Sequence, residues 1–313
     1  KKKKKSGERA KKKQMKQRLQ MHNKRISDFA QRKQLSKAIQ AFEQISEEGL
    51  TPSVYSFTNI INAHVRSGDV EGAQRRLEAM DEHSLAPNVV TFTALLKGLT
   101  TVGDMKAAET LLERMASCED GINLRSANTM LRGCVRMGEV QLAADVSRRM
   151  LTEWSIEADG VSLEYLLRLL SQGLRLDAAK EILNRMLSEE LLGSGSGFVN
   201  LAQAAALVGQ RKLCEAALAA FEKGGEAAAG GVEAERSSVA LFQGHQRSEL
   251  AREVARIRTF LSAKDTGRDA AAERYVSFIC KVLVFSSCLL PPTPSAPSAD
   301  TPTGEGAKEG AGD

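Results

Sequence analysis

Apolar residues recur along most of this chain with the spacing of a helix. In four segments they follow the pattern i, i+3, i+4 and i+7, at 57–64, 92–99, 127–134 and 163–170. This spacing places the four apolar positions of each segment in one stripe along an α-helix. We therefore expect four helices, each with one face in a protein core.

A second apolar stripe follows each of the first. From Val70 to Met80 the apolar positions are three, four and three residues apart, and the same spacing returns 35 residues later. In three places a glycine stands between the two stripes, at Gly68, Gly103 and Gly138. Glycine suits the left-handed conformation at the end of a helix. Each unit is therefore predicted to be two helices joined by a tight turn.

Two columns of apolar residues set the length of the repeat. The first is an alanine column: Ala38, Ala73, Ala108, Ala143 and Ala179. The second lies seven residues further on: Ile45, Met80, Met115, Met150 and Met186. One helical pair cannot bury its own stripe, so copies must stack. The predicted fold is all-α, a right-handed α-solenoid of helix-turn-helix units of about 35 residues with disordered termini.

The remaining segments differ in composition from the repeats. Residues 291–313 are rich in Pro, Ser, Gly and Ala, which is typical of disorder. In chain order we predict a basic disordered arm or the exposed start of a helix (1–18), five units (19–53, 54–88, 89–123, 124–159 and 160–194), a degenerate helical pair or cap (195–224), a helical segment of unassigned role (225–290) and a disordered tail (291–313).

Charge is unevenly distributed along the chain. The formal net charge is +5, yet residues 1–37 hold 16 Lys and Arg against two acids. Within 53–194 there are 15 basic and 20 acidic residues, whereas the four first-helix windows together hold six basic residues and one acid. A regular basic track suits a phosphate backbone, and a solvated face rich in Lys and Arg is the alternative. The basic arm has two interpretations as well, a phosphate contact or a solubilising or nuclear-type tail.

The repeat resembles a known family. The segments VYSFTNIINAHVRSGDVEGAQRRLEAM and VVTFTALLKGLTTVGDMKAAETLLERM, with L-x-P-S or L-x-P-N at the junctions, are similar to pentatricopeptide repeats over about residues 19–194. The Trp, Gly and Tyr pattern of the related tetratricopeptide repeats is not seen. The resemblance implies sequence-specific binding of single-stranded RNA, one repeat per base, along the first helices. Side chains of neighbouring units would clamp the base and read its edge.

The resemblance also implies roles for individual residues. In the family, the fifth residue of a unit and the last residue before the next unit choose the base. The implied pairs are Asn23 with Ser53, Thr58 with Asn88, Thr93 with Asn123, and Asn128 with Asp159, which by family correspondence favour cytosine, adenine, adenine and uracil in 5′ to 3′ order. The implied base-packing residues are Tyr55, Val90, Arg125 and Val161. The basic residues expected at the RNA backbone are Arg66, Lys97, Arg132, Arg136 and Arg168.

Enzymatic motifs are absent from the sequence. No His is followed by x-Glu and no C-x-x-C occurs, so the zinc site of a deaminase is not supported. No Walker-type phosphate loop and no G-x-S-x-G is present either. We expect a protein that is not an enzyme and that has no cofactor, no metal, no membrane span and no small-molecule substrate.

The expected partners are single-stranded RNA and other RNA-processing proteins. By resemblance the chain would act in a mitochondrion or plastid, in RNA processing, stability or translation, by occupying its target. The alternative is a helical-repeat scaffold that binds a protein. The net acidic array supports that alternative, as do Arg125 and Glu164 in columns that would face a nucleotide. RNA binding would weaken steeply with salt.

Overall fold

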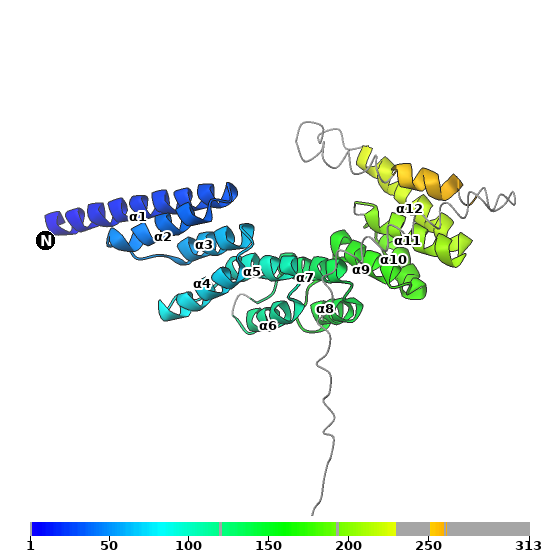
Figure 1. Cartoon of the computed structure of the whole chain (residues 1–313), viewed down its shortest axis with the longest axis horizontal. Helices are drawn as coiled ribbons and strands as arrows, with labels where there is room; N and C mark the ends of the chain where they lie inside the picture. The colour runs from blue at the N-terminus through cyan, green and yellow to red at the C-terminus, as the bar shows by residue number, and fades with distance from the viewer. Residues whose placement is uncertain (1, 119–120, 192–193, 230–250, 260, 262–313) are drawn as a thin grey trace, which may run out of the picture.

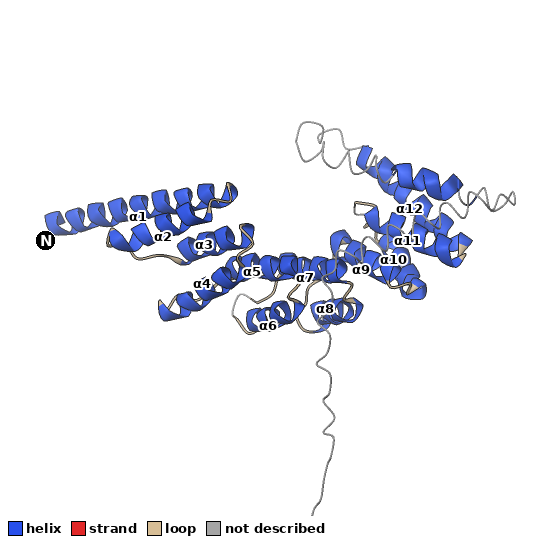
Figure 2. Ribbon diagram, in the orientation of Figure 1, coloured by secondary structure: helices blue, strands red, loops and turns tan. Residues whose placement is uncertain are grey.

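The computed structural model describes residues 2–118, 121–191, 194–229, 251–259 and 261. The regular elements among these residues are helices, and they form no strand (Figure 2). The helices labelled in Figure 1 are α1 (Lys2–Gln31), α2 (Leu35–Glu47), α3 (Val54–Arg66), α4 (Val70–Glu82), α5 (Val89–Val102), α6 (Met105–Ala116), α7 (Leu124–Met137), α8 (Val140–Thr152), α9 (Gly160–Gln172), α10 (Leu176–Ser188), α11 (Ser196–Val208) and α12 (Arg211–Ala229). A further helical stretch spans 251–259.

The helices α3 and α4 show how the sequence builds one unit. The Ser53 hydroxyl accepts a hydrogen bond from the Ser56 backbone N–H (3.3 Å), and the Ser53 backbone N–H donates to the Ser56 hydroxyl (3.1 Å). The Asp69 carboxylate accepts a hydrogen bond from the Gly72 backbone N–H (2.8 Å) and so caps α4. A side-chain cap of this kind stabilises a helix by about 1 kcal/mol. Both helices of the unit therefore begin where their polar caps stand.

The turn inside each unit contains one residue with a positive φ. Gly68, Gly103 and Gly138 have φ values of 83°, 90° and 74°, which confirms their prediction as helix ends. The matching positions of the first and fifth units hold Lys33 and Leu174, with φ values of 54° and 52°. A side chain in this conformation costs about 1–2 kcal/mol. The two turns without glycine are therefore strained relative to the other three.

The first helices of successive units form one layer. They lie side by side in the order α1, α3, α5, α7, α9 and α11, and each second helix packs on the first helices of its own and the next unit (Figure 1). Two glycines permit the close approach within the layer. A Cβ at Gly98 would come within 2.9 Å of Val65, and one at Gly133 within 2.7 Å of Thr100. The first-helix layer is therefore a tightly packed, continuous surface.

The predicted apolar columns form the core. The members of both columns are at most 1% exposed in all five units: Ala38, Ala73, Ala108, Ala143 and Ala179, and Ile45, Met80, Met115, Met150 and Met186. They belong to one buried cluster that runs through the stacked pairs. The predicted all-α helical-repeat solenoid is thus confirmed.

The N-terminal basic segment, predicted to be a disordered arm or the exposed start of a helix, is helical in the structure. Helix α1 begins at Lys2, and the side chains of residues 11–18 are exposed. Lys, Arg, Gln and Ala, which dominate this segment, are good helix formers. The helix continues without a break into the part where Ile26 and Ala30 are buried and where α1 contacts α2 and α3. The first helix of the first unit therefore begins at Lys2, well before residue 19, where the unit was predicted to start.

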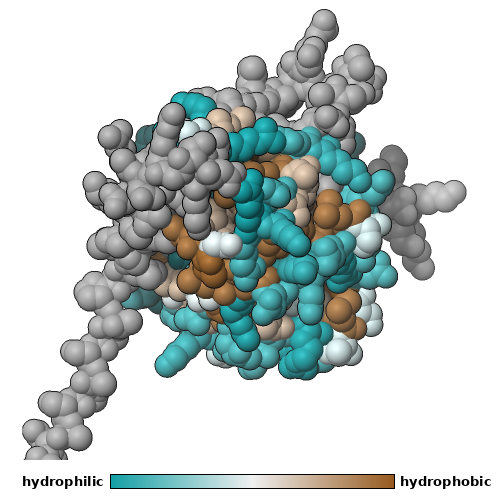
Figure 3. All heavy atoms as spheres, turned by 90° about the vertical axis from the view of Figure 1, so that its right-hand side faces the viewer, coloured by the Kyte–Doolittle hydropathy of each residue, from teal (hydrophilic) through white to brown (hydrophobic). Residues whose placement is uncertain are grey.

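The C-terminal part of the described chain continues the helical pattern. Helices α11 and α12 form the helical pair expected at 195–224, although α12 runs past the predicted boundary to Ala229. Within the stretch 251–259, Val254 and Ile257 are buried, so one face of this helix packs on the array. The surface at this end shows hydrophobic residues gathered among hydrophilic ones (Figure 3). The rest of the predicted segment 225–290 and the predicted tail 291–313 lie outside the described residues.

Among the helices that the structure describes, none combines the length and the apolar character that a bilayer span requires.

Candidate nucleic-acid interface

A groove of about 860 Å³ lies on the first-helix layer. Its lining comes from four successive first helices, α3, α5, α7 and α9, and from the residues that cap α7 and α9. The lining residues are Asn62, Arg66, Val89, Val90, Thr93, Ala94, Lys97, Asn123, Leu124, Arg125, Asn128, Thr129, Arg132, Asp159 and Tyr165. We call this hollow the first-helix groove.

The groove brings together nine of the residues predicted from the sequence. They are Arg66, Val90, Thr93, Lys97, Asn123, Arg125, Asn128, Arg132 and Asp159. The other predicted residues are not part of its lining: Asn23, Ser53, Tyr55, Thr58, Asn88, Arg136, Val161 and Arg168. The units that begin at Val89 and Leu124 therefore contribute most of the predicted site.

The cations of the groove are unpaired. The side chains of Arg66, Lys97 and Arg132 are exposed, and within the described part of the chain none of them forms an ion pair or a hydrogen bond. Several arginines of the second helices are paired instead. Examples are Arg114 with Asp81, and Arg185 with Glu189, each pair with its closest N and O atoms 2.9 Å apart. Because its charges lack counter-ions in the protein, the groove is a local source of positive potential.

The predicted packing residues share an exposed position on their helices. Tyr55 and Val90 are each 62% exposed and Val161 is 44% exposed, while Arg125 is exposed at the same place in its own unit. The residue that follows each of them in the chain is buried. The second position of each unit thus presents one large side chain to solvent at a regular interval along the layer, as an array of flat ligands would require.

The last residue of each of the first four units caps the first helix of the next unit. Oδ1 of Asn88 accepts from the Thr91 backbone N–H (3.0 Å), and Oδ1 of Asn123 accepts from the Ser126 backbone N–H (3.0 Å). The Nδ2 groups of Asn88 and Asn123 make no hydrogen bond to the rest of the described chain. Each amide therefore uses its acceptor for the fold and keeps its donor for a ligand.

The fifth residues lie in different surroundings. Thr58 is only 6% exposed, and its hydroxyl lies 2.8 Å from the Val54 carbonyl oxygen and 2.7 Å from the Thr91 hydroxyl. Thr93 is half-buried in the groove, where its hydroxyl donates to the Val89 carbonyl oxygen (2.7 Å). Thr93 is therefore the more accessible of the two predicted threonine readers.

Asn128 and Asp159 contact each other directly. Nδ2 of Asn128 donates to Oδ1 of Asp159 (3.2 Å), which also accepts from the backbone N–H of Ser162 (2.8 Å) and lies 2.8 Å from the Ser162 hydroxyl oxygen. Burial by itself raises the pKa of Asp159, but the hydrogen bonds from Ser162 and Asn128 outweigh it and hold that pKa below its usual range. Asp159 is therefore a carboxylate at neutral pH and acts only as an acceptor.

Three predicted residues are buried in part or bonded within the protein. Asn23 is 4% exposed and its Oδ1 has no hydrogen-bond partner among the described residues, while its backbone oxygen accepts from Nδ2 of Asn59 (3.1 Å). Arg136 donates to the Thr101 carbonyl oxygen (3.1 Å), and Nε of Arg168 is buried. These positions are less open to a ligand than the residues that line the groove.

Glu164 occupies the fifth position of the unit at 160–194 and is part of the fold. It is 6% exposed, and Oε1 accepts from the Ser194 and Ser196 hydroxyls (2.5 Å each) and from the Gly197 backbone N–H (3.2 Å). Its other oxygen accepts from the Ser194 backbone N–H (2.8 Å). The carboxylate thus stabilises the start of α11, where the helix dipole favours a negative charge.

Sequence reasoning missed two features of the groove. Tyr165 lies one residue beyond the choosing position and lines the groove, although only its aromatic type distinguished it in the sequence. The third residue of each of the four units from 54 to 194 is a hydroxyl residue that is 0% exposed: Ser56, Thr91, Ser126 and Ser162. This column of hydroxyl residues is visible in the sequence, where its members are 35, 35 and 36 residues apart.

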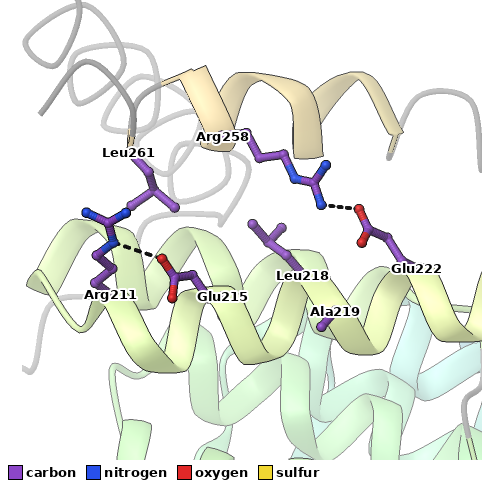
Figure 4. Close-up of a pocket in the computed structure, with 7 residues that line it drawn as sticks. All are labelled: Arg211, Glu215, Leu218, Ala219, Glu222, Arg258 and Leu261. Atoms are coloured by element: carbon purple, nitrogen blue, oxygen red, sulfur yellow. Dashed lines mark hydrogen bonds and ion pairs between the residues drawn. The ribbon is translucent and has the colours of Figure 1, made fainter. Parts of the chain in front are cut away.

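A second hollow, of about 320 Å³, lies between α12 and the stretch 251–259 (Figure 4). Arg211 pairs with Glu215 (2.8 Å) along α12, and Arg258 reaches across to Glu222 (Figure 4). Each of its four charged side chains is therefore ion-paired, in contrast to the cations of the first-helix groove. Within the described residues no group of three or more His, Cys, Asp or Glu could hold a metal ion.

Stacked helical pairs with a basic groove on their first-helix layer define a helical-repeat solenoid protein. Three family models match the chain: "PPR repeat family" at 52–101, "Pentatricopeptide repeat domain" at 8–67, and "PPR repeat" at 90–119 and 125–153. The chain is a pentatricopeptide repeat protein. No curated protein sequence matches it.

Solved structures share the fold. Those of the pentatricopeptide repeat protein PPR10 in complex with an 18-nt psaJ RNA element, one of them with cysteines substituted, each have a TM-score of 0.53 and 17% identity, over 66% of this chain and 30% of that chain. A structure of PPR10 from maize has a TM-score of 0.48 and 11% identity, over 80% of this chain and 39% of that chain. This chain therefore spans less than half of the length of these relatives.

Proposed function

We propose that this chain binds single-stranded RNA with base selectivity along the first-helix groove. The observation that carries the proposal is the composition of that groove. The unpaired cations Arg66, Lys97 and Arg132, the exposed packing residues Val90 and Arg125, and choosing residues from consecutive units line one surface. A phosphate backbone would lie against Arg66, Lys97 and Arg132, because each neutralised phosphate releases counter-ions. The two PPR10 structures in complex with an 18-nt RNA element share the fold and so support the proposal.

Base selection would come from the groups that the fold leaves unused. The free Nδ2 of Asn88 and of Asn123 is a donor that a ring nitrogen of adenine accepts. The Asp159 carboxylate is an acceptor that suits the N3–H of uracil. With the pair of Asn23 and Ser53, the family correspondence gives cytosine, adenine, adenine and uracil in 5′ to 3′ order.

The process would be non-catalytic. We propose that the protein acts by occupying a transcript in RNA processing, stability or translation, in a mitochondrion or plastid and alongside other RNA-processing proteins. These finer statements rest on the family resemblance.

The test is a selection of binders from a random single-stranded RNA pool by the whole chain at about physiological salt, where screening removes loose charge attraction. The expected result is a short motif with two consecutive adenines, which would confirm the register of the Thr58 and Thr93 units. Retention of RNA without any motif would refute base reading and favour the alternative, a scaffold that binds protein.

A further inference from the structure

In the four units from 54 to 194, the third residue places a buried hydroxyl next to the choosing residue that ends the preceding unit. Ser126 shows the local form of this contact: its hydroxyl donates to the backbone oxygen of Asn123 (2.8 Å) and lies 3.2 Å from Oδ1 of the same residue. Thr91 similarly contacts Oδ1 of Asn88 (3.0 Å). The hydroxyl therefore braces the residue that ends the preceding unit.

At Ser162 the hydroxyl makes an additional contact across the unit boundary. It donates to Oδ1 of Asn128 at 2.6 Å and lies 2.8 Å from Oδ1 of Asp159. Because Nδ2 of Asn128 also donates to Asp159 (3.2 Å), the three side chains form a closed triangle. Thr91 makes the equivalent link to Thr58 (2.7 Å), whereas Ser126 makes none to Thr93 within the described residues.

The triangle permits one orientation of the Asn128 amide. Asp159 is an acceptor only, so the amide must turn its NH₂ group toward it and its carbonyl oxygen toward the Ser162 hydroxyl. The reversed amide would bring two acceptor oxygens to 3.2 Å, the distance that now separates Nδ2 from Oδ1 of Asp159. One N–H of Asn128 and Oδ2 of Asp159 then remain without a partner in the described chain and lie at the groove.

We propose that Ser162 is a positioning residue for base selection by the preceding unit. The buried Ser162 hydroxyl fixes the orientation of the Asn128 amide. As a result, Asn128 presents one N–H donor and Asp159 presents one carboxylate acceptor to the base. Uracil offers a matching N3–H beside carbonyl oxygens, whereas cytosine offers a ring-nitrogen acceptor beside an amino donor. Without this hydroxyl, only the 3.2 Å hydrogen bond to Asp159 would hold the amide, in place of that bond and the 2.6 Å bond from Ser162. A base could displace this single bond, so that the amide turns its oxygen toward the cytosine amino group and accepts either pyrimidine. This inference rests on the RNA-binding function proposed above.

The test uses the whole chain and two RNAs that carry the selected motif and differ only in having uracil or cytosine directly 3′ to the two adenines. Ser162→Ala removes the hydroxyl but keeps the backbone N–H that caps α9 through Asp159. The matched control is Ser126→Ala, which removes an equally buried hydroxyl that hydrogen-bonds to Asn123 and to neither Asn128 nor Asp159. Any effect of this control should therefore fall on the preceding nucleotide and not on the choice between uracil and cytosine. Ser162→Thr restores the hydroxyl, as Thr91 shows that this column accepts threonine.

Wild type, Ser126→Ala and Ser162→Thr are expected to prefer uracil, and Ser162→Ala is expected to reduce the uracil-to-cytosine affinity ratio by about three- to tenfold, the worth of one hydrogen bond. Urea unfolding of each variant shows whether it is folded. If Ser162→Ala does not fold, Ser162→Cys is measured in its place, because the thiol keeps about the same volume and is only a weak hydrogen-bond donor.

Two results would overturn the inference, and they are distinguishable. If wild type binds RNA with its preference at this nucleotide and Ser162→Ala retains the same ratio as Ser126→Ala, the positioning role is wrong while RNA reading stands. If wild type shows no binding, or no preference at this nucleotide, the proposed reading by Asn128 and Asp159 fails together with the role of Ser162.

Discussion

The double variant Lys97→Ala with Arg132→Ala tests the groove most directly. Both side chains line the groove, are exposed and have no counter-ion among the described residues. Neither belongs to a predicted choosing pair. Their loss should therefore weaken the binding of every RNA alike and leave the preferred motif unchanged.

The size of the effect follows from counter-ion release. For single-stranded nucleic acid, the logarithm of the affinity falls with the logarithm of the salt concentration by about 0.7 for each neutralised phosphate. Removal of two contacts should make the slope shallower by about 1.4. Between 50 and 200 mM salt, wild type should therefore lose about sevenfold more affinity than the variant loses.

Fluorescence anisotropy of a labelled RNA over a salt series measures this difference. The matched control is Arg114→Ala with Arg185→Ala, which removes two arginines from the second helices, where they pair with Asp81 and Glu189. The control has the same net charge as the test variant and should keep the wild-type slope. An equal change of slope in both double variants would show that overall charge, and not the groove, attracts the RNA.

Three further predictions concern single positions. Thr93→Ala removes a hydroxyl of the groove and should relax base choice at one nucleotide. Selection from random RNA measures this, and recovery of the same motif as for wild type would contradict the role of Thr93 in base choice. Leu174→Gly relieves a φ of 52° and should stabilise the fold by about 1 kcal/mol in urea unfolding, with an unchanged midpoint as the refuting result. Asp69→Ala removes a helix cap and should cost about 1 kcal/mol at neutral pH. The hydrogen bonds from the Gly72 N–H and from His64 lower the pKa of Asp69, so its contribution is present above the unfolded pKa and is lost as pH falls through the folded one. Wild type and variant should therefore converge in acid, and a constant gap would refute the role of the charge.

The apolar columns made the fold predictable from the sequence. Helical periodicity gives the buried face of each helix, and a fixed repeat length brings equivalent faces together. The positions of Gly68, Gly103 and Gly138 between two stripes then gave the turns, and all three adopt the expected left-handed conformation. None of these inferences needed a distance between helices.

The parts of the site that the sequence did not reveal depend on such distances. Thr58 and Asn23 are buried because neighbouring first helices approach closely, and periodicity alone does not determine how closely. The link between Ser162 and Asn128 joins residues 34 positions apart and appears only once two units are stacked. Composition also did not determine the structure of residues 2–18, since Lys-rich segments suit both an exposed helix and a disordered arm.

The last residue of each unit has two roles that restrict each other. Asn88, Asn123 and Asp159 cap the following helix with one oxygen, and the groups left over are those that a base edge would meet. Asn, Asp and Ser are among the best capping residues, and they differ in the donors and acceptors that remain free. Exchange among these three types would therefore alter base choice at little cost to the fold. Replacement by Ala would cost about 1 kcal/mol in addition to the lost contact. Helix capping thus limits the residue types from which a reader at this position is drawn.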